Sequence, residues 1–407
     1  MMLTRPVWAE ISIDRLLNNY RLLREAAGDA GLIAVVKANA YGHGALACAS
    51  ALDAGGASWL GVTCVEEGIA VRSVCRTAHI LVMSGIWEGE AEAALAHRLT
   101  PVVWETAHLE WLEAAARAQQ RPPRSIAVHV EIDTGMSRQG VQPQELPAFL
   151  DRIEQTHCLV LEGVMTHFHS PEVLSGDATA EQMRRFDAAL ATIAARGFHP
   201  AIIHAGNSAT IFAGASEVAS LAAKYGATAM LRPGLALYGY APRFSEKPAS
   251  SAIDALKPVL SWKTRVISLR TAASGESAGY CATFHAKRPS RLALLPVGYA
   301  DGLNRLLSNR GHVLVRGQRA PIAGRISMDL AIVDVTGIPG VELGDEVVLI
   351  GEQYRAQGSA HRAQDAGSRD QITAYDLADL AGTIPYEVLC AISARVPRVT
   401  IGGDARA

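Results

Sequence analysis

Polar side chains follow the ends of several short apolar segments in the first half of the chain. They are Lys37, Tyr41 and His43, Asp133, Thr134 and Arg138, His167 and His169, Asn207 and Ser208, and Arg232 and Gly234. If the apolar segments are the parallel strands of one barrel, their carboxyl ends meet on one rim, which is where barrel enzymes build their active sites. The spacing therefore predicts one site at this rim.

Lys37 ends an apolar segment in the sequence AVVKANAYGHG. A single lysine in such a position is usually solvated or salt-bridged. Apolar surroundings would instead lower its pKa from about 10.4 and free the amine as a nucleophile. Such an amine forms a Schiff base with a carbonyl substrate or with pyridoxal phosphate.

A phosphate group in such a barrel is expected near the seventh and eighth strands. The sequence HAGNSAT offers the Ser208 hydroxyl, and RPGLALYG offers the amides of Gly234 and Leu235. Taken alone, Asn207 and Ser208 are typical of a helix cap. Arg232 either pairs with a carboxylate or, in a cofactor site, faces a pyridine nitrogen.

The pair His167 and His169, in MTHFHSP, raises a metal alternative. Two histidines that are two residues apart on one strand share a face and can ligate zinc. Third and fourth ligands with suitable spacing do not follow in the sequence. We therefore predict no metal site here and expect the His167 ring to stack on a flat cofactor.

Eight short apolar segments alternate with stretches of helical spacing between residues 30 and 235. They are LIAVV (32–36), WLGVTC (59–64), HILVM (79–83), PVVW (101–104), IAVHVEI (126–132), LVLEGVM (159–165), PAIIH (200–204) and AMLR (229–232). Strands separated by helices predict parallel βαβ units, and eight of them suit a closed (β/α)8 TIM-type barrel. A doubly wound open sheet is the alternative, but no Gly-x-Gly-x-x-Gly follows the first strand.

The second half of the chain has a sequence pattern typical of β-strands. SWKTRVISLR, RLALLPVGYA, HVLVRG and GDEVVLIGE alternate or run apolar over short lengths between glycine-rich turns. We predict an α/β barrel domain over residues 11–243 and a mostly β domain over residues 244–407. Residues 372–381 and 385–392 are predicted to be helical.

The composition argues against several classes of protein. A formal net charge of -2 leaves no basic surplus for binding nucleic acid or an anionic membrane. No uncharged apolar run is long enough to span a bilayer, and the start, MMLTRPVWAEISID, has no apolar core of signal-peptide length. The six cysteines form no Cys-x-x-Cys pair, which favours reduced thiols. We therefore expect a cytoplasmic protein.

From AVVKANAYGHG onward the chain resembles the bacterial alanine racemases, the barrel-type (fold type III) pyridoxal-phosphate enzymes. The resemblance covers nearly the whole chain and recurs in the family's order through EIDTGMSRQG, GVMTHF, HAGNSAT, RPGLALYG, GESAGYCATF, LPVGYADGLNR, PIAGRISMDL and TIPYEVLC. It implies pyridoxal 5'-phosphate as the cofactor and the two enantiomers of alanine as substrates, with D-alanine supplied for cell-wall peptidoglycan.

Within the barrel, the resemblance implies that Lys37 holds the cofactor and moves a proton. It implies that His167 lies near the pyridine ring and Arg232 on the ring nitrogen. Arg138 matches the arginine near the phenolic oxygen and the substrate carboxylate. The remaining residues that it implies around the cofactor, mostly at the phosphate, are Tyr41, Asn207, Ser208, Gly234, Leu235 and Tyr386.

Within the β domain, Tyr280 matches the second catalytic base, and Met328 matches the residue whose backbone N–H meets the substrate carboxylate. Tyr299 and Arg305 match residues that line the access path and support the second base, and Asp329 is a further supporting residue. In the family these groups come from the other subunit. The resemblance therefore implies a head-to-tail homodimer with shared active sites. It also implies that the first strand, within residues 1–10, belongs to the β domain.

One position departs from the family's pattern. Many relatives carry a carbamylated lysine at position 131, whose negative charge holds the arginine at position 138, but this chain has Glu131. A glutamate keeps the charge on a shorter side chain, so we expect a water, an ion or another side chain to bridge it to Arg138. The simpler interpretation is that Glu131 pairs with a different cation of the rim.

Three other functions stay open from the sequence. They are a racemase of broader substrate range on the same scaffold, a pyridoxal-phosphate-binding carrier without turnover, and a metal-dependent barrel hydrolase. The β domain with Tyr280 argues against the carrier. The visible absorbance of a lysine-bound cofactor would argue against the hydrolase.

Overall fold

The chain divides into two compact units. The computed structural model describes residues 5–248, 250–355 and 369–403. The barrel unit comprises Arg15–Ala40 and Ala45–Lys257, and the β unit comprises Met1–Asp14, Tyr41–Gly44 and Pro258–Ala407. The predicted fold class, a (β/α)8 barrel followed by a mostly β domain, is confirmed. The predicted boundary at residues 243/244 stays a prediction, and the compact units divide between Lys257 and Pro258.

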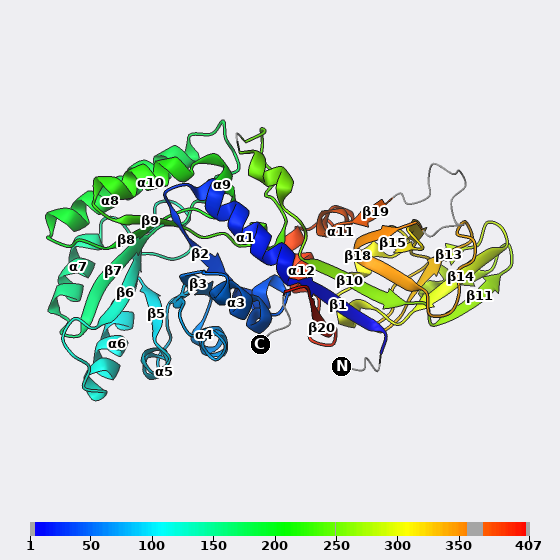
Figure 1. Ribbon diagram of the computed structural model, residues 1–407, viewed down its shortest axis with the longest axis horizontal. Helices are drawn as coiled ribbons and strands as arrows, with labels where there is room; N and C mark the ends of the chain where they lie inside the picture. Colours follow the sequence, from blue (N-terminus) through cyan, green and yellow to red (C-terminus); the bar gives the residue numbers. More distant parts are fainter. Residues whose placement is uncertain (1–4, 249, 356–368, 404–407) are drawn as a thin grey trace. The chain divides into compact units, whose positions relative to one another are not determined.

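Eight parallel strands close the barrel, and β9 pairs back with β2 (Figure 1). They are β2 (Gly31–Val35), β3 (Trp59–Val62), β4 (His79–Val82), β5 (Leu99–Val103), β6 (Ile126–Glu131), β7 (Leu159–Met165), β8 (Ile202–His204) and β9 (Thr228–Leu231). Each overlaps an apolar segment predicted to be a strand. Parallel strands that are covered on both faces need such continuous apolar runs, and this is why the strands could be predicted from the sequence.

Helices surround the strands of the barrel (Figure 1). They are α1 (Ile13–Ala27), α3 (Ala45–Ala54), α4 (Val65–Arg72), α5 (Ala91–Ala96), α6 (Thr106–Ala118), α7 (Leu146–Gln155), α8 (Ala178–Ala195), α9 (Ser208–Ala213) and α10 (Ala215–Lys224). One apolar cluster takes a buried side chain from β2, β3, β4, β5, β7 and β9, namely Ile33, Trp59, Leu81, Val102, Met165 and Met230. Because the barrel strands share this cluster, it is a packed core and leaves no open pore.

The β unit is built on a seven-stranded sheet of order β16-β15-β18-β10-β1-β20, with β19 paired to β18. A three-stranded sheet, β11-β14-β17, and the pair β12-β13 complete the unit. The strands are β1 (Val7–Ser12), β10 (Leu260–Arg265), β11 (Ser268–Ala272), β12 (Ser277–Ala278), β13 (Phe284–His285), β14 (Ser290–Leu295), β15 (His312–Val315), β16 (Gln318–Pro321), β17 (Ala331–Asp334), β18 (Glu346–Tyr354), β19 (Arg369–Ile372) and β20 (Arg398–Ile401). The first strand, β1, is antiparallel to β10 and parallel to β20.

Two helices of the β unit, α11 (Ala374–Ala381) and α12 (Pro385–Cys390), lie where helices were predicted. Ile372 was predicted to be helical but is the last residue of β19. The reason is local, because the Thr373 side chain accepts the Asp376 N–H and caps the helix one residue later. Gly382, with φ 71°, ends α11, because glycine adopts this left-handed conformation without a steric cost.

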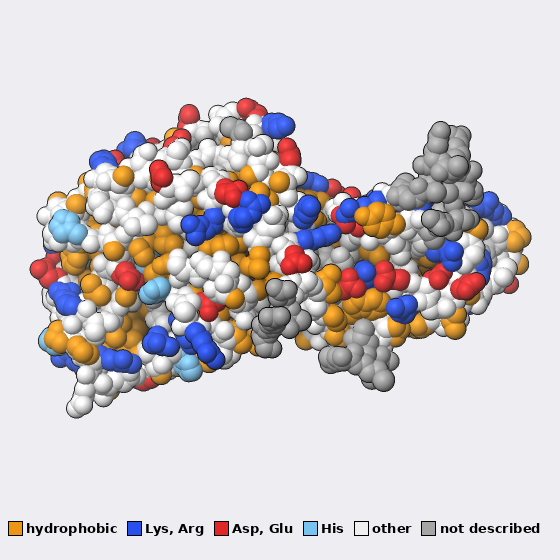
Figure 2. Space-filling model, in the orientation of Figure 1, with side chains coloured by type: hydrophobic (Ala, Val, Ile, Leu, Met, Phe, Trp, Pro, Cys, Tyr) orange, Lys and Arg blue, Asp and Glu red, His pale blue; other side chains and the backbone are white. Residues whose placement is uncertain are grey.

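The outer surface has mixed charge on the face shown in Figure 2, where Lys and Arg side chains are interspersed with Asp and Glu. Among the described residues, no helix is long and apolar enough to cross a membrane.

Candidate active site

Lys37 begins an unusual turn two residues after the end of β2. The segment α2 (Lys37–Tyr41) has left-handed backbone angles, with φ 51° at Ala38, 54° at Asn39 and Ala40, and 52° at Tyr41. This conformation costs L-residues roughly 1–2 kcal/mol each, and none of these four is glycine. Strain of this kind persists only where neighbouring groups hold it, and it is typical of functional sites.

Hydrogen bonds from other elements hold the left-handed turn. Glu67 on α4 accepts the Ala38 N–H at 2.7 Å with one carboxylate oxygen and the Thr63 N–H at 2.8 Å with the other. The Asn39 side-chain oxygen accepts the Ala45 N–H at 2.8 Å. Glu67 therefore ties the turn after β2 to the end of β3. Glu67 could not be selected from the sequence, because a glutamate in the first turn of a helix has many simpler explanations.

His167 is surrounded by three cations of the expected site. Arg232 Nη2 lies 3.2 Å from His167 Nδ1, and because arginine has donors only, Nδ1 must accept. Burial, followed by the charges of Arg232, Arg138 and Lys37, lowers the pKa of His167 to about 3. The ring is therefore neutral at pH 7. Lys37, Arg138 and Arg232 all act on His167 through their charges, and cations near one ring suit an anion.

Arg232 follows β9 and is almost completely buried, at 4% exposed. Its Nη2 donates to the Thr166 carbonyl at 2.6 Å, and its Nη1 lies 3.1 Å from His204 Nδ1. Burial lowers the pKa of Arg232 to about 10 while the Glu131 charge acts in the opposite direction, so the guanidinium stays protonated at neutral pH. Arg232 is thus a fixed donor and does not accept a proton.

The two segments expected at the phosphate contact each other. The Ser208 hydroxyl accepts the N–H groups of Gly234 and Ala236 at 3.1 and 3.3 Å. Leu235, between them, begins a short 3-10 turn. Asn207 is the N-cap of α9, with its side-chain oxygen accepting the Ala209 N–H at 2.8 Å, so the helix-cap interpretation is confirmed for Asn207.

Glu131 is buried at the end of β6, with 2% exposed. Its Oε2 accepts a hydrogen bond from Gln139 Nε2 at 2.6 Å, and Gln139 Nε2 also donates to the Met83 carbonyl at 3.0 Å. Burial raises the pKa of Glu131, against the opposing effects of Gln139, Arg232 and Arg138. The side chain that meets Glu131 is therefore Gln139, the neighbour of Arg138, and Arg138 acts on it through its charge. A bridge from Glu131 to Arg138 was expected from the sequence, but Gln139 was not identified there.

The loop that carries Arg138 is shaped by Asp133. Asp133 Oδ1 accepts the N–H groups of Gly135 and Ser137 at 2.9 and 3.1 Å, and Oδ2 accepts from Gln142 Nε2 at 3.0 Å. Burial alone would raise the pKa of Asp133, but these donors lower it. Asp133 therefore stays ionised and holds the loop, while the Arg138 side chain itself is exposed.

The histidine pair that suggested a metal does not lie on a strand. Strand β7 ends at Met165, so His167 and His169 belong to the loop that follows, and this premise of the metal hypothesis is wrong. His169 is exposed and its Nδ1 lies 2.6 Å from Ser170 Oγ, whereas His167 turns to Arg232. In the described ranges, no group of three or more His, Cys, Asp or Glu side chains could hold a metal ion.

In the β unit, Tyr299 and Met328 lie on adjoining backbone. The N–H groups of Tyr299 and Ala300 donate to the carbonyls of Ser327 and Met328, each at 3.0 Å. A Cβ on Gly298 would lie 2.3 Å from both carbonyl oxygens, so only glycine allows this close approach. The side chains remain exposed, 42% for Tyr299 and 53% for Met328.

Tyr280 lies in the short turn η3 (Tyr280–Ala282) and is 68% exposed. Its neighbour Cys281 accepts a hydrogen bond at Sγ from Arg325 Nη1 at 3.4 Å, which brings this turn to the segment that also carries Met328. Arg305 begins η5 (Arg305–Leu307) and is exposed as well. The β unit therefore presents Tyr280 and Arg305 with exposed side chains.

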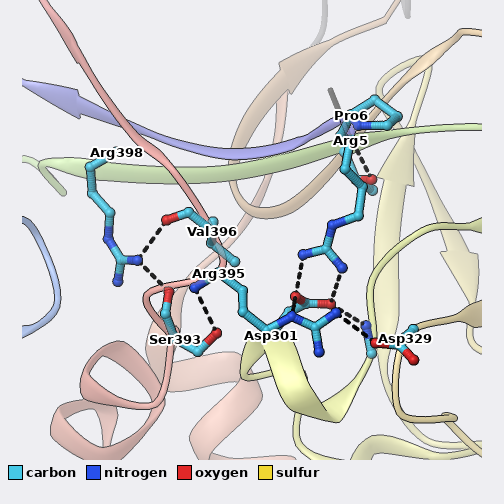
Figure 3. A network of polar contacts seen from close by, with 10 residues as sticks. Arg5, Pro6, Asp301, Asp329, Ser393, Arg395, Val396 and Arg398 are labelled. Carbon is cyan, nitrogen blue, oxygen red and sulfur yellow. Dashed lines mark hydrogen bonds and ion pairs between the residues drawn. The ribbon is translucent and has the colours of Figure 1, made fainter. Parts of the chain in front are cut away.

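A buried carboxylate anchors the Tyr299 turn (Figure 3). Asp301, 0% exposed, accepts from Arg5 Nη1 at 3.2 Å and from the Gly298 N–H at 3.0 Å. Arg395 lies 3.6 Å from Asp301 and donates to Asp329 at 2.6 Å, as Figure 3 shows. Asp329 and the Tyr299 turn are thus joined through Arg395. Asp301 was not among the residues selected from the sequence, although a lone aspartate inside the motif GYADG could have indicated it.

Tyr41 and Tyr386, both expected at the phosphate, come together within the β unit. Their ring centroids are 5.9 Å apart. Burial, above all, raises the pKa of Tyr41, so its hydroxyl keeps its proton at neutral pH and is able to donate it in a hydrogen bond.

The solved structures that this chain resembles define its class. Alanine racemase from the D-cycloserine producer Streptomyces lavendulae has a TM-score of 0.84 at 32% identity and covers 99% of this chain and 98% of that chain. Alanine racemase from Bartonella henselae, solved with covalently bound pyridoxal phosphate, has a TM-score of 0.79 at 28% identity and covers 97% of this chain and 99% of that chain. Fold and site together define a two-domain barrel isomerase that acts on amino acids.

Sequence comparison gives the family. Residues 11–242 match the alanine racemase N-terminal domain, and residues 259–400 match the alanine racemase C-terminal domain. The alanine racemase of Symbiobacterium thermophilum is 40% identical over 400 residues and covers 98% of this chain and 98% of its own. The chain belongs to the alanine racemase family.

Proposed function

We propose that the chain interconverts L-alanine and D-alanine with pyridoxal 5'-phosphate by a two-base mechanism, in the cytoplasm, and supplies D-alanine for peptidoglycan. The observation that carries the proposal is the convergence of Lys37, Arg138 and Arg232 around a neutral His167. An amine, two guanidinium groups and a flat neutral ring suit a small aromatic aldehyde that carries a phosphate, together with a substrate carboxylate. All six cysteines are free thiols, which agrees with a reducing compartment.

The residues of the rim fit the cofactor. Lys37 supplies the amine that would hold it, and Arg232, which only donates, suits an unprotonated ring nitrogen. Ser208 with the turn at Gly234 would bind the phosphate, and the family resemblance adds the hydroxyls of Tyr41 and Tyr386. When bound, the cofactor acidifies the α-proton of the amino acid by delocalising negative charge. Because Arg232 keeps its own proton, this delocalisation is limited, which disfavours side reactions such as transamination.

Inversion of the α-carbon requires a proton to leave one face and another to arrive on the opposite face. We assign one face to the Lys37 amine and the other to the Tyr280 hydroxyl. A tyrosine hydroxyl ordinarily ionises only near a pKa of about 10, so a base of this type needs a cationic neighbour at neutral pH. Arg305 is the candidate for that neighbour. The Met328 N–H and Arg138 would bind the substrate carboxylate.

We further propose that two chains form a head-to-tail dimer with shared active sites. The exposure of Tyr280, Tyr299 and Met328 supports this, because a single chain leaves these side chains available to a second one. In a symmetric dimer, each chain would supply its β-unit residues to the partner's barrel.

The direct test is racemisation by the purified chain with added pyridoxal phosphate. We expect D-alanine to form from L-alanine faster than D-serine from L-serine or D-lysine from L-lysine. Comparable rates across the three amino acids would instead indicate a racemase of broader range.

Lys37→Ala should lose both activity and the visible absorbance of the bound cofactor. Lys224→Ala, which breaks an exposed ion pair with Asp187, is the matched control and should keep both. An active Lys37→Ala chain would contradict the proposal.

A further inference from the structure

A row of hydrogen-bonding side chains crosses the barrel and ends at Arg232. Glu162 Oε2 on β7 lies 3.3 Å from His129 Nε2 on β6. His129 Nδ1 lies 2.7 Å from His204 Nε2, and His204 Nδ1 lies 3.1 Å from Arg232 Nη1. The two histidines are completely buried, whereas 29% of the Glu162 side chain is exposed. The row therefore links a carboxylate that reaches solvent to the buried arginine of the rim.

The direction of every hydrogen bond in this row follows from the arginine. Because a guanidinium has donors only, Arg232 donates to His204 Nδ1, and a neutral His204 must carry its proton on Nε2. That proton points to His129 Nδ1, so His129 carries its own proton on Nε2 and donates it to Glu162. Burial, above all, lowers the pKa of both histidines, which makes them neutral at pH 7. All donors therefore point from the cation towards the carboxylate.

The barrel is shaped to hold this row. A Cβ on Gly163 would lie 2.5 Å from His129 Nδ1, so the imidazole can cross β7 only because residue 163 is glycine. The Trp59 ring lies 5.3 Å from the His129 ring and stacks on His79 at 4.6 Å. The hydrogen bond from His129 is the largest cause that lowers the pKa of Glu162. Glu162 is thus ionised at neutral pH and closes the row with a full negative charge.

We propose that Glu162 and His129 are positioning residues for Arg232 and act on it through His204. The row fixes the tautomers of both histidines and the plane of the Arg232 side chain. It also balances the arginine charge from a distance, with two neutral rings between the charges. A carboxylate next to a ring nitrogen would promote its protonation, whereas this arrangement leaves only donors there. The inference rests on the proposed function for the identity of the group that Arg232 meets. The direction of the hydrogen bonds does not depend on it.

The tautomers can be measured without cofactor. Two-bond ¹H–¹⁵N spectra of ring-labelled histidine in the apo protein, at neutral pH, report which nitrogen carries the proton. We expect His129 and His204 each to be neutral with the proton on Nε2. Their signals are assigned by loss in His129→Phe and His204→Gln. A proton on Nδ1, or an imidazolium, at either histidine would overturn the proposal.

The coupling to Glu162 is tested by Glu162→Gln, which keeps an acceptor oxygen but removes the charge. The ring ¹⁵N shifts of both His129 and His204 should move, whereas the exposed Glu154→Gln, on α7, should leave them in place. Unchanged shifts in Glu162→Gln would overturn the coupling.

In the cofactor-loaded protein, Glu162→Gln should lower kcat by about threefold to tenfold, the effect of one ordinary hydrogen bond, and leave KM nearly unchanged. The visible absorbance of the bound cofactor should shift in the same variant, because Arg232 is less firmly held. A wild-type protein that racemises alanine but shows the wrong tautomers would refute this inference and leave the proposed function standing. If the tautomers are as expected but the protein does not racemise alanine, the proposed function is refuted and this inference stands.

Discussion

The barrel unit and the β unit hold their expected active-site residues in opposite ways. On the barrel rim, Arg232 and Ser208 are buried and hydrogen-bonded, and Lys37 begins a strained turn held by Glu67. In the β unit, Tyr280 and Met328 expose more than half of their surface. One chain therefore completes the packing around the groups that would hold a cofactor. It leaves the groups that would act on the substrate open on its surface.

This difference indicates which tasks a single chain performs. A cofactor that remains bound through many turnovers benefits from donors fixed by packing, as in the row that ends at Arg232. Groups that meet a small substrate have to allow it to enter and leave. In the β unit the buried Asp301 accepts the Gly298 N–H and so holds the Tyr299 turn, while the side chains expected to meet the substrate stay accessible. The following predictions test this division.

Removing the hydroxyl of Tyr280 should have the largest effect. Tyr280→Phe should keep the visible absorbance of the bound cofactor but lose racemisation by about a hundredfold to ten-thousandfold, the usual contribution of a general acid or base. Tyr354→Phe, at another exposed tyrosine of the β unit, is the matched control. Both variants are measured for D-alanine formation and for cofactor absorbance. Racemisation at the wild-type rate by Tyr280→Phe would refute the two-base assignment.

Mixing two inactive variants should restore activity if the two units work across a dimer. Lys37→Ala and Tyr280→Phe chains are exchanged in equal amounts, with exchange verified by a mass tag. Activity should return to about a quarter of the wild-type value, because about half of the dimers are hybrids and each hybrid has one intact site. No recovery despite verified exchange would count against shared sites.

Asp301→Asn should destabilise the β unit, because it leaves Arg5 and Arg395 without their buried partner. The expected loss in the free energy of unfolding is about 2–4 kcal/mol, near the lower end for buried pairs since both arginines reach solvent. Asp329→Asn removes an exposed partner of Arg395 and should cost less than about 1 kcal/mol. Both are measured by denaturant unfolding. Equal losses in the two variants would mean that burial does not distinguish the two carboxylates.

Glu131→Gln should weaken turnover by loosening the loop that carries Arg138. Hydrogen bonds to charged groups are worth roughly 1.5–3 kcal/mol, so we expect a loss of about tenfold to a hundredfold in kcat/KM. Gln139→Leu should have a similar effect, since Gln139 is the side chain that contacts Glu131. Activity should not depend on dissolved carbon dioxide. Wild-type kcat/KM in Glu131→Gln would show that this carboxylate does not take the place of the carbamate.

The sequence alone determined the eight barrel strands, the cap at Asn207 and the helices of the β unit. These features depend on neighbouring residues, because a strand that is covered on both faces must be apolar along its length and a cap acts within three residues. Lys37, His167 and Arg232 could be selected from the sequence for the same reason, since each lies within two residues of the end of such a strand.

Only the tertiary structure decided which of these residues touch. The left-handed turn after Lys37 contains no glycine, and its support comes from Glu67, a residue of another βα unit. His129, His204 and Arg232 are far apart in the chain and become neighbours because the barrel closes. Gln139 meets Glu131 because Asp133 bends the loop between them. Long-range contacts of this kind depend on how the strands are ordered around the barrel, and no local pattern of residues specifies them.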